Sequence, residues 1–433
     1  MRLVRIWFLG ALALVALPAA ARADDLPRRG FLGAVLAPSP EQKGAAVVRV
    51  LPGAAAAAAG VQAGDVVVEV NGAATSTPAE VVAAFKPLRA GQTLSLTVVR
   101  NGERTTLRST LKDVVESSPD FDVEYRSVDV DGARRRVIVT RPHGGGKHPA
   151  VLLVGGIGCY SIDNPFDPDD PYKKLLYALT RQGFVTVRVE KTGMGDSQGP
   201  PCATADVDLE VRGYVAAARA TRSYDFVDPE RLFIFGHSIG GIVGPLVAAE
   251  VPVRGIVAAE TVGTNWYEYE LENTRRQLVL TGADYEAVET TMREKEKCAR
   301  LLLVDKQSPD EITKADPGCA DFMRYPADYR YLQQIADLNY AKLWKQFGGA
   351  VLVIYGSSDF VTSADEHRYI AATVNATHPG KGTFVEIPGM DHYLSKRASQ
   401  AESLRSATTP GSPPAEYCEA FTDTILSWLK RQA

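Results

Sequence analysis

The sequence of 433 residues lacks a basic surplus, a second long apolar run and the signatures of cofactor or metal sites. Its 48 Lys and Arg residues are outnumbered by 52 Asp and Glu residues, so nothing favours a nucleic-acid partner. After the N-terminal region, no apolar run reaches the ~20 residues of a membrane-spanning helix, so we expect no stable membrane span. No Rossmann glycine fingerprint, P-loop or zinc-ligand spacing occurs, and we therefore expect no cofactor and no metal ion.

The one long apolar run lies at the N-terminus. Arg2 and Arg5 precede an apolar stretch at residues 6–17, and small residues around Ala21 and Ala23 follow it. This pattern predicts a secretory signal over residues 1–23. A membrane anchor is the alternative, but the run is short for a span. We therefore expect an exported protein, periplasmic or secreted.

Cysteine is scarce, and an exported chain meets an oxidising environment in which disulfides persist. The five residues allow at most two bridges: Cys159, Cys202, Cys298, Cys319 and Cys418. The pairs 298/319 and 159/202 are candidates. Several buried thiols are an equal alternative, because spacing does not reveal connectivity.

Residues 29–112 predict a compact β-rich domain. Strand-like runs at residues 46–51, 65–70 and 93–100 surround one helical stretch at 78–85, and Asn71-Gly72 predicts a tight turn. The polar residues 113–120 predict a linker.

The glycine motifs of this region resemble a PDZ domain of the bacterial HtrA type. They are Gly30-Phe31-Leu32-Gly33, Leu51-Pro52-Gly53, the run 59–65 and Val70-Asn71-Gly72. The resemblance implies that the loop 30–33 presents backbone N–H groups to the C-terminal carboxylate of a bound peptide. The alternative is a spacer, or a domain that docks on its own enzyme. We expect the linker to let the two parts move separately, so a chain starting near residue 118 should keep its turnover on a small ester.

From residue 121 to 433 strands alternate with helices, which predicts an α/β domain with a mostly parallel sheet. The predicted strands are a hairpin at 128–140 and runs at 150–154, 184–190, 231–235, 253–258, 350–355 and 383–387. The predicted helices are 171–182, 205–222, 240–251 and 417–431. Residues 264–349 are helical and charged without a strand, and predict a helical cap over the site.

A G-x-S-x-G motif at residues 236–240 lies between a buried strand and an apolar helix. Glycines there allow the sharp turn that exposes a serine nucleophile at a helix N-terminus, so Ser238 is the predicted nucleophile. A serine hydroxyl needs a base that an acid orients. Asp359 and His392 each follow a strand downstream in that order, and we predict them as acid and base. Asp391 is the weaker candidate for the acid.

An oxyanion formed at Ser238 needs two backbone N–H donors. Ile239, the next residue, supplies the first. Ile157 or Gly158, in the glycine-rich loop after the strand at 150–154, supplies the second. The H-G-G-G run at 143–146 precedes that strand and is therefore interpreted as a turn.

The stretch 151–394 resembles the α/β-hydrolase superfamily, and residues 193–199 resemble the G-x-G-x-S-x-G loop of its esterases and aminopeptidases. Gly155 departs from the pattern, because many members carry His there. The resemblance implies hydrolysis of a carboxylic ester through an acyl-enzyme on Ser238. Two alternatives stay open: a serine peptidase or aminopeptidase acting on small peptides or amides, and a non-catalytic peptide-binding protein on a hydrolase scaffold. The expected partners are a small ester or peptide substrate and a peptide C-terminus at the PDZ-like domain.

Overall fold

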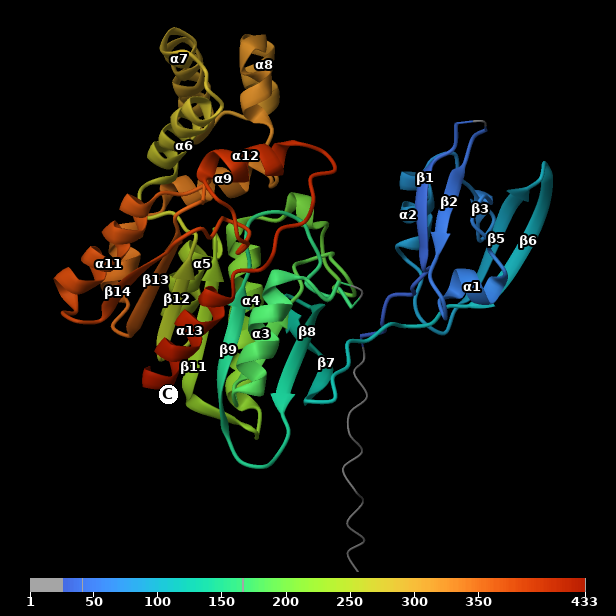
Figure 1. Ribbon diagram of the computed structural model, residues 1–433, viewed down its shortest axis with the longest axis horizontal. Helices are drawn as coiled ribbons and strands as arrows, with labels where there is room; N and C mark the ends of the chain where they lie inside the picture. Colours follow the sequence, from blue (N-terminus) through green and yellow to red (C-terminus); the bar gives the residue numbers. More distant parts are fainter. Residues whose placement is uncertain (1–25, 41, 166, 433) are drawn as a thin grey trace, which may run out of the picture.

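Two β-sheets, one of six strands and one of eight, organise the computed structural model, which describes residues 26–40, 42–165 and 167–432 (Figure 1). The predicted signal at 1–23 lies outside the described residues. Within the described ranges, no helix combines the length and apolarity that crossing a membrane requires.

The smaller sheet has the order β1-β2-β3-β5-β6, with β4 paired to β3. Its elements are β1 (Ala34–Pro38), β2 (Ala45–Val50), α1 (Ala55–Ala59), β3 (Val66–Val70), β4 (Ala73–Ala74), α2 (Pro78–Phe85), β5 (Thr93–Arg100) and β6 (Glu103–Thr110). Alternate residues of β5, Leu94, Leu96 and Val98, are buried and pack with Val81 of α2. The turn after β3 has φ of 48° at Asn71 and 86° at Gly72, as a two-residue hairpin turn requires.

The larger sheet has the order β14-β13-β12-β11-β9-β10-β8-β7. Its strands are β7 (Phe121–Val130), β8 (Ala133–Pro142), β9 (His148–Val154), β10 (Val185–Val189), β11 (Val227–His237), β12 (Gly255–Ala259), β13 (Ala350–Gly356) and β14 (Gly382–Ile387). Strands β7 and β8 form an antiparallel hairpin, and β8 pairs antiparallel to β10. Beyond it, β10, β9, β11, β12, β13 and β14 pair in parallel, in that order across the sheet. The carboxyl ends of the parallel strands therefore meet at one edge, where the predicted site residues lie.

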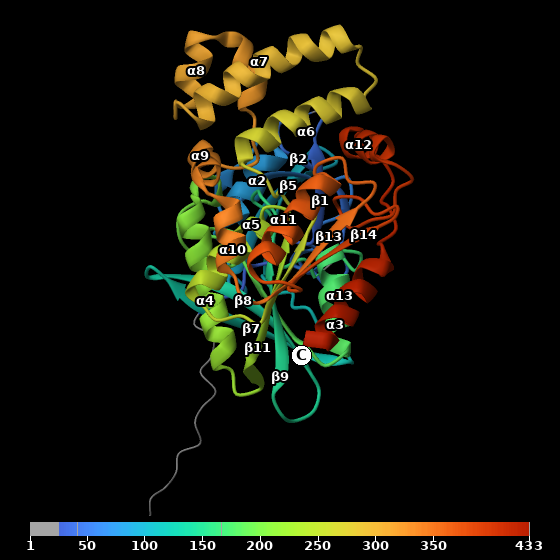
Figure 2. The same ribbon diagram turned by 90° about the vertical axis from the view of Figure 1, so that its left-hand side faces the viewer.

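Helices cover both faces of this sheet (Figure 2). They are α3 (Pro171–Arg181), α4 (Val207–Ser223), α5 (Gly240–Glu250), α11 (Ala364–Thr377) and α13 (Glu419–Gln432), with α12 (Gln400–Thr408) beside the site end. Side chains of β9 alternate between the two layers: Leu152 packs with α4 and α5, whereas Val151 and Leu153 pack with α3 and α13. This burial on both faces explains the continuous apolar run of the strand.

Between β12 and β13 the chain forms helices joined by loops, in the range where we expected a cap. The helices are α6 (Trp266–Leu280), α7 (Tyr285–Leu303), α8 (Pro309–Ala315), the 3-10 segment η2 (Pro317–Met323), α9 (Tyr329–Asp337) and α10 (Tyr340–Gln346). A disulfide between Cys298 and Cys319 joins α7 to η2, and a second joins Cys159 to Cys202. Both candidate pairings are therefore present, and Cys418 is a buried thiol.

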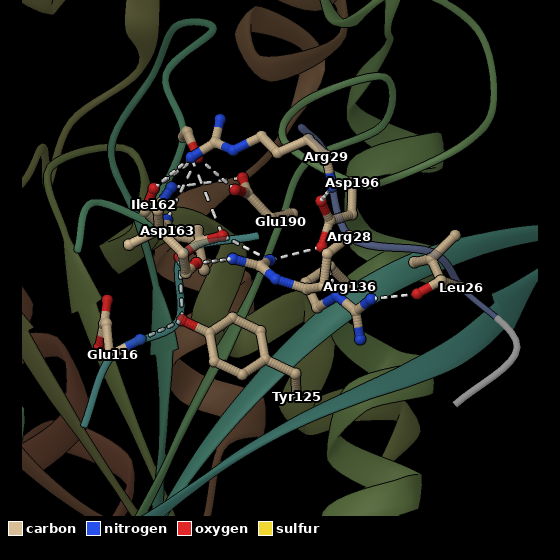
Figure 3. Close-up of polar contacts among 12 residues, drawn as sticks. Leu26, Arg28, Arg29, Glu116, Tyr125, Arg136, Ile162, Asp163, Glu190 and Asp196 are labelled. Carbon is tan, nitrogen blue, oxygen red and sulfur yellow. Dashed lines mark hydrogen bonds and ion pairs between the residues drawn. The ribbon is translucent and has the colours of Figure 1, made fainter. Parts of the chain in front are cut away.

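A buried network of charges joins the N-terminal segment to the larger domain (Figure 3). The guanidinium of Arg28 lies 2.6 Å from the carboxylate of Asp163 and 2.5 Å from that of Asp196. The predicted linker takes part, because its Glu116 is 7% exposed and lies 2.6 Å from Arg188. We expected this linker to let the two parts move separately; these contacts tie Glu116 of the linker and Arg28 of the N-terminal segment to the hydrolase domain.

The loss of these contacts has a predictable cost. A chain that begins near residue 118 lacks Arg28 and Glu116, and it leaves three buried charges, Asp163, Asp196 and Arg188, without these partners. Removing one member of a buried pair costs ~3–5 kcal/mol. We therefore expect the shortened chain to unfold more readily, instead of keeping full turnover as the sequence suggested.

A point substitution isolates this effect. Arg28→Met should lower the thermal unfolding midpoint by several degrees, because it removes a cationic partner from two buried carboxylates, Asp163 and Asp196. Arg219→Met is the control, since Arg219 pairs with Glu250 on the surface, where the side chains are 61% and 59% exposed. Circular dichroism measures both midpoints. Equal midpoints for the two variants would show that the junction contributes no stability.

Candidate active site

Ser238 lies on a sharp turn between β11 and α5. Its φ is +54°, in the left-handed region that few non-glycine residues adopt. A Cβ atom at Gly236 would lie 2.3 Å from the carbonyl oxygen of Gly240, and one at Gly240 would lie 2.0 Å from that of Val154. Only glycine fits at both positions, which explains the motif and the exposure of the serine at the start of α5.

The three residues predicted as nucleophile, base and acid lie in a chain of contacts. The ring atom Nε2 of His392 is 3.2 Å from Ser238 Oγ, and its Nδ1 is 2.9 Å from Asp359 Oδ2. Asp359 follows β13 and His392 follows β14, so the edge of the parallel sheet brings them together. The geometry lets the hydroxyl donate to Nε2 while Nδ1–H donates to the carboxylate.

Asp359 is fully buried, and its environment favours the negatively charged carboxylate. Burial raises its pKa, but His392 and further hydrogen bonds outweigh burial and hold that pKa well below its usual range. Its Oδ1 accepts from the N–H groups of Val361, at 2.5 Å, and Thr362, at 3.2 Å. Asp359 is therefore ionised at neutral pH.

Asp391 has a different environment. Its carboxylate accepts hydrogen bonds from the N–H groups of Tyr393 and Ser395, each at 3.0 Å, and from Ser403 Oγ at 3.2 Å. These contacts organise the loop that carries the neighbouring histidine, which gives Asp391 a structural place.

The loop after β9 lies beside Ser238. A Cβ atom at Gly156 would lie 3.5 Å from Ser238 Cβ. Ile157 lines the cavity that contains Ser238, whereas Gly158 lines only a small neighbouring cavity. Lys191 donates a hydrogen bond of 2.7 Å to the carbonyl oxygen of Gly156 and so holds the loop. Of the two candidates for the second oxyanion donor, this placement favours Ile157.

His237 and Tyr172 are site residues that the sequence analysis did not assign. His237 Nε2 lies 2.9 Å from the carbonyl oxygen of His392, and its Nδ1 lies 2.6 Å from the hydroxyl of Tyr172. Burial, helped by the neighbouring His392, lowers the pKa of His237 to about 3, so the ring is neutral and Nε2–H donates to the carbonyl. His237 thereby fixes the backbone of His392. Its place within the elbow motif was the available signal.

A cavity of about 480 Å³ opens at Ser238 and His392. Its aromatic lining consists of Tyr160, Tyr172, Trp266, Tyr269 and Tyr393. Asp170 is the one acidic side chain among the described lining residues, and it already accepts a hydrogen bond of 2.9 Å from the N–H of Lys173. The cavity therefore suits an apolar or aromatic group and offers no pair of carboxylates for an ammonium group.

The fold, and the residues gathered at the carboxyl ends of its parallel strands, are those of an α/β-hydrolase preceded by a PDZ domain. Residues 143–401 match the alpha/beta hydrolase family and residues 30–111 match the PDZ domain, so the chain belongs to the alpha/beta hydrolase family.

Three known proteins illustrate the similarity. The esterase EstD of Thermotoga maritima is 23% identical over 57% of this chain and 55% of its own length. The magnetosome formation protease MamE of Paramagnetospirillum magneticum is 47% identical over 18% of this chain and 10% of its own length. The chain thus spans little more than half the length of the first relative and a tenth of the second. The structure of Est1E from Butyrivibrio proteoclasticus covers 71% of this chain and 98% of its own, with 12% identity and a TM-score of 0.43.

Proposed function

We propose that the protein is a serine hydrolase that cleaves carboxylic esters. Ser238 Oγ attacks the ester carbonyl carbon while its proton passes to His392 Nε2, and Asp359 stabilises the imidazolium. The N–H groups of Ile239 and Ile157 hold the oxyanion. The tetrahedral intermediate then collapses to the acyl-enzyme, and the leaving alcohol takes the proton from His392. A water molecule, deprotonated by the same ring, then releases the acid from Ser238.

The observation that carries this proposal is the contact chain from Asp359 through His392 to Ser238 beneath an aromatic cavity. The apolar lining supports an ester over a substrate with a free amino terminus. Turnover of p-nitrophenyl esters of graded chain length beside aminoacyl-nitroanilides tests it. Faster cleavage of the anilides would identify a peptidase, and cleavage of neither, with peptide binding retained, would identify a binding protein.

We further propose that the PDZ domain binds the C-terminus of a peptide or protein. Strand β1 lies at the edge of its sheet, where an extended peptide can add as a strand. Beside it, the loop 30–33 and α2 line a cavity of about 460 Å³, which Asn164 and Pro165 of the hydrolase domain help to close. The N–H groups of Gly30 and Phe31 already donate to carbonyl oxygens. We therefore propose that the N–H groups of Leu32 and Gly33 donate to the carboxylate of the peptide.

Peptide binding should depend on a free carboxylate and on Gly33. Gly33→Ala should weaken binding at least tenfold, because φ is +71° and the new Cβ would lie 2.0 Å from that of Ala54. Gly145→Ala is the control, since Gly145 has open space around it. Fluorescence polarisation with peptides that end in a free acid or an amide measures both. Equal affinity for acid and amide would refute a carboxylate site.

Two disulfides support an oxidising compartment, and we propose that the protein is exported to the periplasm or secreted.

A further inference from the structure

The carboxyl group of Glu260 lies inside the site, and the acyl-transfer steps proposed above do not use it. Glu260 directly follows β12, at the same edge of the sheet as Ser238, and it is 0% exposed. A ligand atom of each of Glu260, Asp359 and His392 lies within 4.8 Å of the other two. We assign no metal ion here, because His392 Nδ1 and Asp359 Oδ2 are already hydrogen-bonded to each other. A second buried acid therefore neighbours the pair that activates the nucleophile.

The backbone around Glu260 is shaped to hold this side chain. Its φ is +48°, which is uncommon for a residue with a side chain. A Cβ atom at Gly356 would lie 2.9 Å from Glu260 Oε1 and 2.3 Å from the carbonyl oxygen of Met390. The glycine that ends β13 thus leaves room for the carboxyl group. Strained backbone of this kind gathers at functional sites.

Two carboxyl groups this close in a buried site cannot both be ionised. Asp359 accepts hydrogen bonds from Val361, Thr362 and His392, all of which favour its charged form. Neither carboxyl oxygen of Glu260 has a partner at ordinary hydrogen-bond geometry among the described groups; the backbone N–H of Gly356 and the carboxyl group of Asp359 are the polar groups that interact with it. Burial, together with the charge of Asp359, raises the pKa of Glu260 well above its ordinary value. Glu260 therefore holds the proton of the pair.

We propose that Glu260 is a positioning residue, protonated throughout the reaction, which donates a hydrogen bond to the carboxylate of Asp359. This inference rests on the proposed function. The hydrogen bond holds the carboxylate in place and makes it a weaker acceptor for the proton on His392 Nδ1. Glu260 thereby sets the pH range in which His392 acts as a base, without touching the substrate.

The groups that face Glu260 come from three elements. Tyr355 and Asp359 belong to β13 and the loop after it, and Asp391 and His392 belong to the loop after β14. From α11, His367 accepts a hydrogen bond of 2.9 Å from the N–H of Thr261, the residue that follows Glu260. Burial lowers the pKa of His367 to about 4, so it is neutral where the enzyme acts.

Two substitutions separate the possible roles of Glu260 through the pH profile of kcat/KM. Glu260→Gln keeps a donor of the same shape, so activity should stay within about threefold and the acid-side midpoint should not move. Glu260→Met fills the space without a donor. It should lower kcat about tenfold at unchanged KM and move the acid-side midpoint to higher pH, because Asp359 becomes the stronger acceptor.

The control is Glu366→Gln, which replaces another buried acid, 2% exposed, whose carboxyl group accepts a hydrogen bond from Thr264 and not from a member of the triad; it should leave the midpoint unchanged. If Glu260→Gln moves the midpoint to lower pH, the wild-type group is an anion and the proposal is wrong. If Glu260→Met behaves as Glu260→Gln does, the residue only fills space, and the proposal is equally wrong.

Infrared difference spectroscopy tests the proton itself without any turnover. The wild type at pH 8 should show the C=O stretch of a protonated, buried carboxyl group, and Glu260→Gln should lose that band. Buried Glu190 and Glu366, whose pKa values burial raises to about 7, contribute equally to both proteins and cancel in the difference. A wild-type-minus-variant spectrum without the band contradicts the inference. Failure of ester hydrolysis with the band intact would instead count against the proposed function alone.

Discussion

Ser238→Ala should reduce ester turnover by a factor on the order of 10³ to 10⁶ and abolish labelling by a fluorophosphonate probe. The reason is geometric as well as chemical. The elbow presents the hydroxyl 3.2 Å from His392 Nε2, which can take its proton as the oxygen attacks. Without the oxygen, only substrate binding and the oxyanion donors remain to favour the reaction.

The control for this prediction is Ser161→Ala. Ser161 lines the same cavity, but its hydroxyl donates to Glu190 and not to the histidine base. This variant should keep its labelling and most of its turnover. Labelling that persists in Ser238→Ala would remove the residue from the role of nucleophile.

Asp359→Asn should lower turnover by about 10⁴, because an amide permits the wrong tautomer of His392 and no longer stabilises its charged form. The carboxylate lies 2.9 Å from His392 Nδ1, and four hydrogen bonds hold it as an anion. The measurement is kcat at saturating ester, with the thermal midpoint recorded for each variant.

Asp391→Asn is the matched comparison, since Asp391 is also buried and adjoins the same histidine. Its oxygens accept hydrogen bonds within their own loop, so we expect a modest loss of stability and far less loss of turnover. The reverse ranking of the two variants would overturn the assignment of the acid.

The sequence predicted the larger sheet well because its strands are buried on both faces and therefore appear as uninterrupted apolar runs. Residues such as Val151 and Leu152 belong to opposite layers of the core, yet both are apolar. The elbow motif and two strand ends then gave three candidate residues, which the structure brings into contact.

Polar and edge elements were harder to predict. Strand β6 is exposed along most of its length and reads Glu-Arg-Thr-Thr at its start, so it shows no apolar alternation. Strand β1, which lies at the sheet edge, is only half-buried and was missed for the same reason. Apolar residues alternate along a strand because one of its faces is buried, and these two strands bury little of their surface.

The polar network at the domain junction had no local signal at all. Arg28 and Asp196 are 168 positions apart, and neither lies in a periodic pattern. Glu116 was assigned to a linker because its neighbours are polar. Glu260, in contrast, follows a buried strand at the functional edge, as Asp359 does, and this placement was a signal that could have found it.

The acyl-enzyme itself is the most direct test of the account. A p-nitrophenyl ester is mixed with the protein, the reaction is stopped in acid, and peptide mapping by mass spectrometry locates the acyl group. The account predicts one acyl group, on the peptide that contains Ser238, which disappears in Ser238→Ala. Steady hydrolysis of the ester with no acyl group on Ser238, or with one on another residue, would contradict it.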